Sequence, residues 1–63
     1  MNIGDKVTYI TLAPYKKERG IVKGLSSEGY VFVVYHCDDN WDRYFDYTGA
    51  RTDMNNLKMG WDE

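Results

Sequence analysis

The residues with the most obvious potential for covalent chemistry are His36 and Cys37, which are adjacent in the chain. A cysteine nucleophile is usually activated by a base within hydrogen-bond reach. His36 ends an apolar run that predicts a β-strand, and consecutive side chains of a strand point to opposite faces. Because His36 is also the only histidine, the sequence predicts a small semi-buried thiol beside a strand-end histidine and not a catalytic pair.

The segment DDNWDRYFDYTG, which starts at Asp38, has the spacing of a calcium loop in its first half. Asp38, Asn40 and Asp42 stand at positions one, three and five, where such loops place oxygen ligands. The sixth position requires glycine and holds Arg43, and the twelfth requires glutamate and holds Gly49. One cysteine and one histidine are also too few for a zinc site. We therefore expect no metal and no cofactor.

The carboxylates of the same segment raise the question of acid–base hydrolysis; they belong to Asp38, Asp39, Asp42 and Asp46. A chain of 63 residues has little room for the concave pocket that would hold a substrate between two of them. No glycine-rich stretch precedes a helix, so a phosphate-binding loop is not expected either. The sequence predicts that the protein is not an enzyme.

Four aromatic rings lie among these carboxylates within seven positions: Trp41, Tyr44, Phe45 and Tyr47. One interpretation is that most of them extend the core. Another is that one or two stay exposed beside the carboxylates, where a ring attracts a lysine or arginine by about 0.5–2 kcal/mol. Both can hold, with inner rings structural and outer rings in contact. The candidate partner-binding residues are Asp38, Trp41, Asp42, Arg43, Tyr44 and Tyr47, with Tyr15 and Trp61 as further candidates.

The first half of the chain carries the opposite charge. Residues 1–36 hold five basic and three acidic side chains, and residues 37–63 hold three basic and seven acidic ones, which gives the net charge of −2. This split predicts a surface with two differently charged sides. The basic side suggests contact with nucleic acid, although the net negative charge favours ordinary solvated lysines. The residues for this alternative are Tyr15, Lys16, Lys17, Arg19 and Lys23.

Length and composition predict a single domain, residues 1–63. A chain this short buries only about 60% of its unfolded surface, and its single cysteine allows no internal disulfide. Aromatic residues make up 16% of the chain, and we expect their burial to compensate. The free cysteine, the lack of a signal-like start and the short apolar run 30–35 predict a protein of a reducing cytoplasm, with no membrane contact.

Residue types predict strands at 6–12, 18–25 and 30–36, and shorter ones at 47–53 and 57–61. Gly20 and Gly24 indicate a bulge or bend, and Gly29 supplies a positive φ to the turn after them. Residues 13–18, with the only proline, predict an exposed loop. Residues 53–57 predict one helical turn capped by Thr52 or Asp53. The expected fold is mainly β, a small five-stranded antiparallel barrel with one short helical turn before the last strand.

Residues 36–47 show neither the alternation of a strand nor the period of a helix. Long loops in compact domains are usually functional or disordered, and four rings argue against disorder. We expect an ordered loop that folds back over an open end of the barrel.

The opening GDKV, the GIV of the second strand and the YVFVVY of the third resemble the Src-homology-3-like (SH3-like) barrels, including KOW and Tudor modules. More specifically, VFVVY, NWDRYFDYTGART and the final GW resemble a family of very short phage and prophage proteins, over nearly the whole chain. The first loop, APYKKE, is shorter than in some relatives. The resemblance implies a phage origin, a place in the host cytoplasm and a compact barrel, with no activity to transfer. Likeness to Tudor modules implies a surface that holds cationic side chains.

We therefore expect a non-enzymatic, phage-derived binding module that engages a host or phage protein through the aromatic and acidic loop and modulates it. The alternative is a KOW-like barrel that binds nucleic acid through its basic first loop and second strand. A third arrangement is a homodimer that buries the exposed rings against a second copy.

Overall fold

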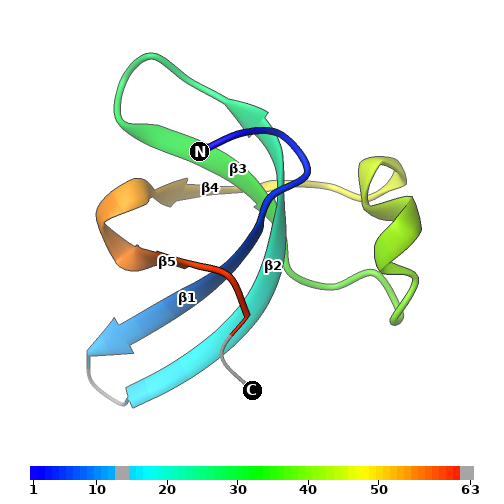
Figure 1. Cartoon of the computed structure of the whole chain (residues 1–63), viewed down its shortest axis with the longest axis horizontal. Coiled ribbons are helices and arrows are strands. Elements are labelled where there is room, and N and C mark those ends of the chain that lie inside the picture. The colour runs from blue at the N-terminus through cyan, green and yellow to red at the C-terminus, as the bar shows by residue number, and fades with distance from the viewer. Residues whose placement is uncertain (13–14, 62–63) are drawn as a thin grey trace.

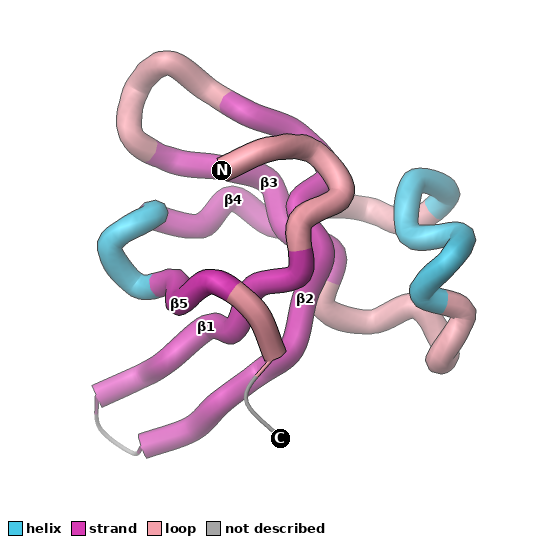
Figure 2. The backbone as a smooth tube through the Cα atoms, in the orientation of Figure 1, coloured by secondary structure: helices cyan, strands magenta, loops and turns pink. Residues whose placement is uncertain are grey.

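The structure is a computed structural model that describes residues 1–12 and 15–61. Five antiparallel strands form one sheet: β1 (Lys6–Leu12), β2 (Tyr15–Leu25), β3 (Tyr30–Val34), β4 (Ala50–Asp53) and β5 (Leu57–Met59). Two short 3-10 helices accompany them, η1 (Trp41–Asp46) after β3 and η2 (Met54–Asn56) before β5. Figure 2 shows how much of the chain is strand. The expected mainly β fold with a helical turn before the last strand is confirmed.

The strand order is β4-β3-β2-β1-β5, and every neighbouring pair is antiparallel. The edge strands β4 and β5 are joined by only the three residues of η2, so the sheet must curl to bring its edges near each other (Figure 1). Within the described residues β4 and β5 do not pair with each other. The sheet is therefore strongly curled and open, where a closed barrel was expected.

The hairpin of β1 and β2 is longer than the sequence indicated. Tyr15 pairs with Leu12 and Lys16 pairs with Thr11, so the exposed loop expected over 13–18 is wrong from residue 15 onward. Residues 13–14 of that loop lie outside the described residues. Long lysine side chains suit an exposed strand, because their stems pack on neighbours while the ammonium group stays in water.

Glycines shape the hairpin of β2 and β3. The register shifts between Val22 and Gly24, which is the bulge expected there, and Gly29 has a φ of 90°, as predicted for the turn. β3 ends at Val34 and β4 begins at Ala50, so both are shorter than the expected 30–36 and 47–53. In the described ranges no helix is long and apolar enough to cross a membrane.

The inner face of the curled sheet carries the core. Its centre is four fully buried valines, Val7, Val22, Val31 and Val33, with Tyr35 and Leu57 packed against them. Burying one valine stabilises a fold by about 1.5 kcal/mol or more relative to leaving it exposed. This cluster therefore holds β1, β2, β3 and β5 together.

The outer face is buried at one place as well. Ile21 of β2 lies opposite Val34 of β3, and both are buried although they point away from the valine core. The helix η1 packs against β2, and Figure 1 shows it beside the sheet, on the side away from η2. β3 is therefore buried on both faces only at its end, at Val33 and Val34, while Phe32 on the outer face is exposed. The expectation that this strand is covered on two sides, which its apolar run favours, holds only for that end.

Candidate functional site

From the end of β3 to the end of η1, the backbone forms hydrogen bonds between residues that are three positions apart. The N–H of Asn40 donates to Cys37 O at 2.8 Å, that of Arg43 to Asn40 O at 2.9 Å, and that of Tyr47 to Tyr44 O at 3.1 Å. Arg43 leaves the helical region, with φ −115° and ψ 26°, so η1 is kinked there. Within the segment expected to be an ordered loop, residues 41–46 therefore form a 3-10 helix. Bonds from residue i to i+3 give a period of three, which tests for strand and α-helical periods do not detect.

One row of side chains faces the rest of the molecule. It consists of Trp41 and Tyr44 of η1 and of Tyr47, the C-cap residue that follows η1, and each is half-buried. The Trp41 ring meets the Trp61 ring edge-on, with centroids 5.0 Å apart. At the other end the Nζ of Lys23 in β2 donates to the carbonyl oxygen of Tyr47. These contacts fasten η1 to the sheet at both ends.

The other two rows of η1 face solvent. Phe45 follows Asp42 by three residues and is 58% exposed, and its ring meets that of Tyr44 edge-on at 5.8 Å. Arg43 and Asp46 form the third row and pair with each other, with Nη2 and Oδ2 3.0 Å apart. We call Asp42, Arg43, Phe45 and Asp46 the outer face of η1. It presents one apolar ring among three charged groups.

The turn that leads into η1 has an unusual backbone. Asp38 and Asp39 have φ values of 51° and 63°, a left-handed conformation that costs energy in residues other than glycine and that aspartate tolerates better than most. Both carboxylates are exposed. A shallow cleft of about 200 Å³ lies at this turn. It is lined by Tyr35, His36, Cys37, Asp38, Asp39 and Trp41.

The two residues with potential for covalent chemistry end in different surroundings. His36 is exposed and Cys37 is buried. Burial raises the pKa of the Cys37 thiol, and the carboxylates of Asp39 and Asp38 raise it further. A thiol that stays protonated is a poor nucleophile and a poor metal ligand. Among residues 1–12 and 15–61 no group of three or more histidine, cysteine or acidic side chains has the arrangement of a metal site.

The basic side chains proposed for nucleic acid contact do not lie on one face. Lys16 precedes Lys17 in β2, so the two point to opposite faces, and Lys23 is bonded to η1. Tyr15 takes part in β2, and its side chain lies outside the described structure. Arg19 shares a face with Lys17, since the two are two residues apart in the strand.

The strand register adds two cations, Lys6 and Lys58, that the sequence pattern did not suggest. Lys58 of β5 and Arg19 of β2 lie on either side of Thr8 in β1, and directly opposed residues share a face. By strand alternation Lys6 and Lys17 lie on that face too. The four are exposed. We call Lys6, Lys17, Arg19 and Lys58 the basic face of the sheet.

Trp61 lies between the basic face and η1. The Nζ of Lys6 lies 4.8 Å from its ring centre, and the guanidinium carbon of Arg19 lies 5.6 Å from it. The indole N–H donates to Gly20 O at 3.0 Å. Trp61 therefore joins the chain end, β2 and η1, and its first role is structural.

Phe45 is the residue of η1 that sequence reasoning left out. It was grouped with the other rings, and the candidate set took Trp41, Tyr44 and Tyr47 instead. Those three are the half-buried row. A period of three in the sequence separates the half-buried rings from the exposed one. Positions 41, 44 and 47 are all aromatic and three residues apart, and Phe45 does not belong to that series.

Comparisons with protein families, with curated proteins and with solved structures each find no match for this chain.

Proposed function

We propose that the chain is a non-enzymatic binding module of phage origin, with an SH3-like fold, that engages a host or phage protein in the host cytoplasm through the outer face of η1 and modulates it. The observation that carries this proposal is Phe45. Its ring is 58% exposed in a charged helix that is fixed to the rest of the fold at both ends. Aromatic anchors within polar rims dominate the energetics of protein contacts.

Charge indicates the kind of partner. Asp42 and Asp46 flank Phe45, and Asp38 and Asp39 are exposed at the preceding turn. A basic surface with a pocket for one ring would complement this arrangement and speed association. A standard protein–protein interface buries about 800 Å² of accessible surface on each partner. For this protein that area is roughly a fifth of its total accessible surface of 4421 Å². The contact would therefore extend from η1 to the Asp38–Asp39 turn.

The test compares variants in capture from lysate of infected host cells. Phe45→Ala should remove the captured partner that wild type retains, and Asp42→Asn should weaken its capture. Leu25→Ala is the matched control, because Leu25 is also exposed, at 49%, and lies at the end of β2. Identical partner lists for wild type and Phe45→Ala would contradict the proposal.

The register gives specific support to a second candidate, nucleic acid binding. The basic face gathers four cations on β1, β2 and β5 beside the Trp61 ring, which resembles the combination of charge and stacking that single strands require. Four phosphate contacts predict that log K falls with log[salt] with a slope of about −3.

A salt titration of binding to single-stranded RNA tests this candidate. Lys17→Glu with Lys58→Glu should abolish binding. Lys16→Glu, on the opposite face of β2, is the control with the same change of charge per residue and should retain most of it. Binding that is absent at low salt, or lost equally in both variants, would exclude the basic face.

A further inference from the structure

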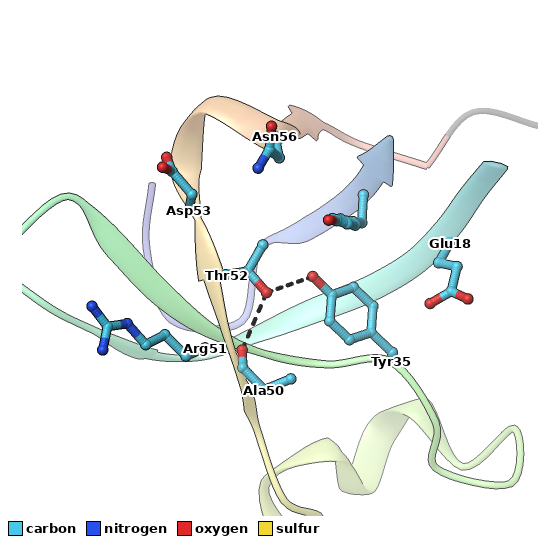
Figure 3. Close-up of a pocket in the computed structure, with 8 residues that line it drawn as sticks. Glu18, Tyr35, Ala50, Arg51, Thr52, Asp53 and Asn56 are labelled. Carbon is cyan, nitrogen blue, oxygen red and sulfur yellow. Dashed lines mark hydrogen bonds between the residues drawn. The ribbon is translucent and has the colours of Figure 1, made fainter. Parts of the chain in front are cut away.

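The curled sheet has a second hollow, separate from η1, at its open end between β1, β2 and the β4–η2 corner (Figure 3). Its volume is about 400 Å³, enough for a long side chain. Its lining includes Tyr9, Glu18, Tyr35, Thr52, Asp53 and Asn56. They come from β1, β2, β4, η2 and the segment that follows β3, and they span residues 9 to 56, so no local motif marks this pocket.

Two tyrosine rings form its apolar wall. Tyr9 and Tyr35 meet edge-on, with centroids 6.0 Å apart and planes at 62°, and both are half-buried. The Tyr35 hydroxyl is hydrogen-bonded to Thr52 Oγ1 at 2.7 Å, and that oxygen is 3.2 Å from Ala50 O (Figure 3). The Tyr35 ring is thus held in place by β4 before any ligand arrives, which lowers the cost of binding.

The charge around these rings is negative. Glu18 lies directly opposite Tyr9 in the β1–β2 register, so its side chain is on the same face as that ring. In the described part of the chain no hydrogen bond or ion pair engages the Glu18 carboxylate. Asp53 also borders the pocket, but its side chain lies on the Arg51 side of β4, away from the tyrosines (Figure 3), where Oδ1 caps η2 by accepting from Asn55 N–H at 2.9 Å.

The nearby cations leave the pocket open. Arg51 contributes to its lining but extends away from it, as Figure 3 shows, and its guanidinium carbon lies 4.1 Å from the Tyr30 ring centre. Lys16 is on the Glu18 face of β2, two residues nearer the end of the hairpin, and is exposed. The pocket therefore combines aromatic faces with the Glu18 carboxylate.

We propose that this pocket binds the cationic side chain of a lysine or arginine presented by a partner protein. The methylene stem would pack on Tyr9 and Tyr35, where a cation is also attracted by the ring faces. The charged end would lie beside the Glu18 carboxylate. An anion would be repelled by this carboxylate, and a purely apolar group would displace water from it without replacing its hydrogen bonds. This site is independent of η1 and adds a second point of contact.

The test is an NMR titration with two small probes, Nα-acetyl-lysine methylamide and its uncharged analogue, Nα-acetyl-norleucine methylamide. The lysine probe should give saturable shifts at the amides of Tyr9, Glu18, Tyr35 and Thr52. The norleucine probe should bind at least about threefold more weakly, since it lacks the cation. Equal affinities, or no saturable shift with the lysine probe, would overturn the proposal.

Variants locate the effect. Glu18→Gln should weaken the lysine probe about threefold. Asp53→Asn should leave the affinity unchanged, because the Asp53 side chain faces away from the tyrosines (Figure 3) and asparagine caps η2 as well as aspartate does. Glu28→Gln is the control, an exposed carboxylate between β2 and β3, and should change nothing. Phe45→Ala should also leave probe binding intact, which separates this site from the one on η1. Equal losses in the Glu18 and Glu28 variants would show only a general charge effect and would contradict the pocket.

Discussion

At the residue scale, Tyr35 combines packing with a buried polar contact. Its ring touches the valine core and Tyr9, and its hydroxyl bonds to Thr52. Burial raises the pKa of Tyr35, the Thr52 bond opposes this, and Tyr9 and Glu18 raise it further. The folded protein therefore holds the phenol proton more tightly than the unfolded chain does. As pH rises above about 10 the unfolded state ionises first, so the free energy of unfolding falls.

Replacing Tyr35 with phenylalanine removes both the Thr52 bond and the ionisable phenol. At neutral pH the variant should lose about 1 kcal/mol of unfolding free energy, the net worth of one hydrogen bond. Between pH 9 and 11 its stability should decline less steeply than that of wild type, because the ionisation is gone. Urea unfolding across this range measures both. Parallel alkaline slopes would show that Tyr35 does not control the decline.

At the element scale, the close packing of β2 against the end of β3 depends on Gly20. A Cβ there would collide with Val33 Cγ1 and come within 3.1 Å of both Tyr35 Cδ1 and the backbone oxygen of Val34. Gly20→Ala should therefore destabilise the fold by about 2 kcal/mol or more through overpacking. Gly24→Ala is the matched control in the same strand, since its nearest neighbour is the Phe32 ring at 3.3 Å, at the edge of the exposed face. Thermal unfolding should rank Gly20→Ala well below Gly24→Ala, and equal losses would contradict this packing.

The same scale shows what the sequence could predict. Strand β1, the bulge near Gly24, the Gly29 turn and η2 follow from local residue types, and each is predicted. For the cap of η2 the residue types leave Thr52 and Asp53 open, and the structure shows Asp53. The start of β2 is not predicted, because Tyr15 and Lys16 are ordered by pairing with β1 and not by their own propensity. The rows of η1 do not follow from strand or α-helical periodicity, because the side chains of a 3-10 helix repeat every three residues. The tyrosine pocket could not be predicted, because it joins residues that only the curl of the sheet brings together.

At the scale of the whole molecule, Trp61 links the segment after β5 to β2 and η1. Thr8 Oγ1 donates to Gly60 O at 2.7 Å, and Gly60 N–H donates to Lys6 O at 2.8 Å, which lays the Trp61 ring against β2 and Trp41. A chain of 63 residues has a total stability of only about 3–9 kcal/mol. One large ring is therefore a substantial share of it.

Two substitutions separate the roles of this ring. Trp61→Phe should cost about 1 kcal/mol of unfolding free energy, since it keeps an aromatic contact and loses the bond to Gly20 O. Trp61→Ala should cost about 3 kcal/mol, which is about a third or more of the total stability. Circular dichroism during urea unfolding measures both. A Trp61→Ala variant as stable as wild type would mean that the contacts at the chain end do not hold the fold.

The central claim is that η1 has an inner row that stabilises the fold and an outer face that is left for contact. Urea unfolding of Trp41→Ala and Phe45→Ala compares the two directly, without a partner. Trp41→Ala should lower the free energy of unfolding by about 2 kcal/mol, because it removes a half-buried ring packed on Trp61. Phe45→Ala should lower it by less than about 1 kcal/mol, because the ring is mostly in water. If Phe45→Ala costs as much as Trp41→Ala or more, Phe45 belongs to the core and the outer face of η1 is not a contact surface.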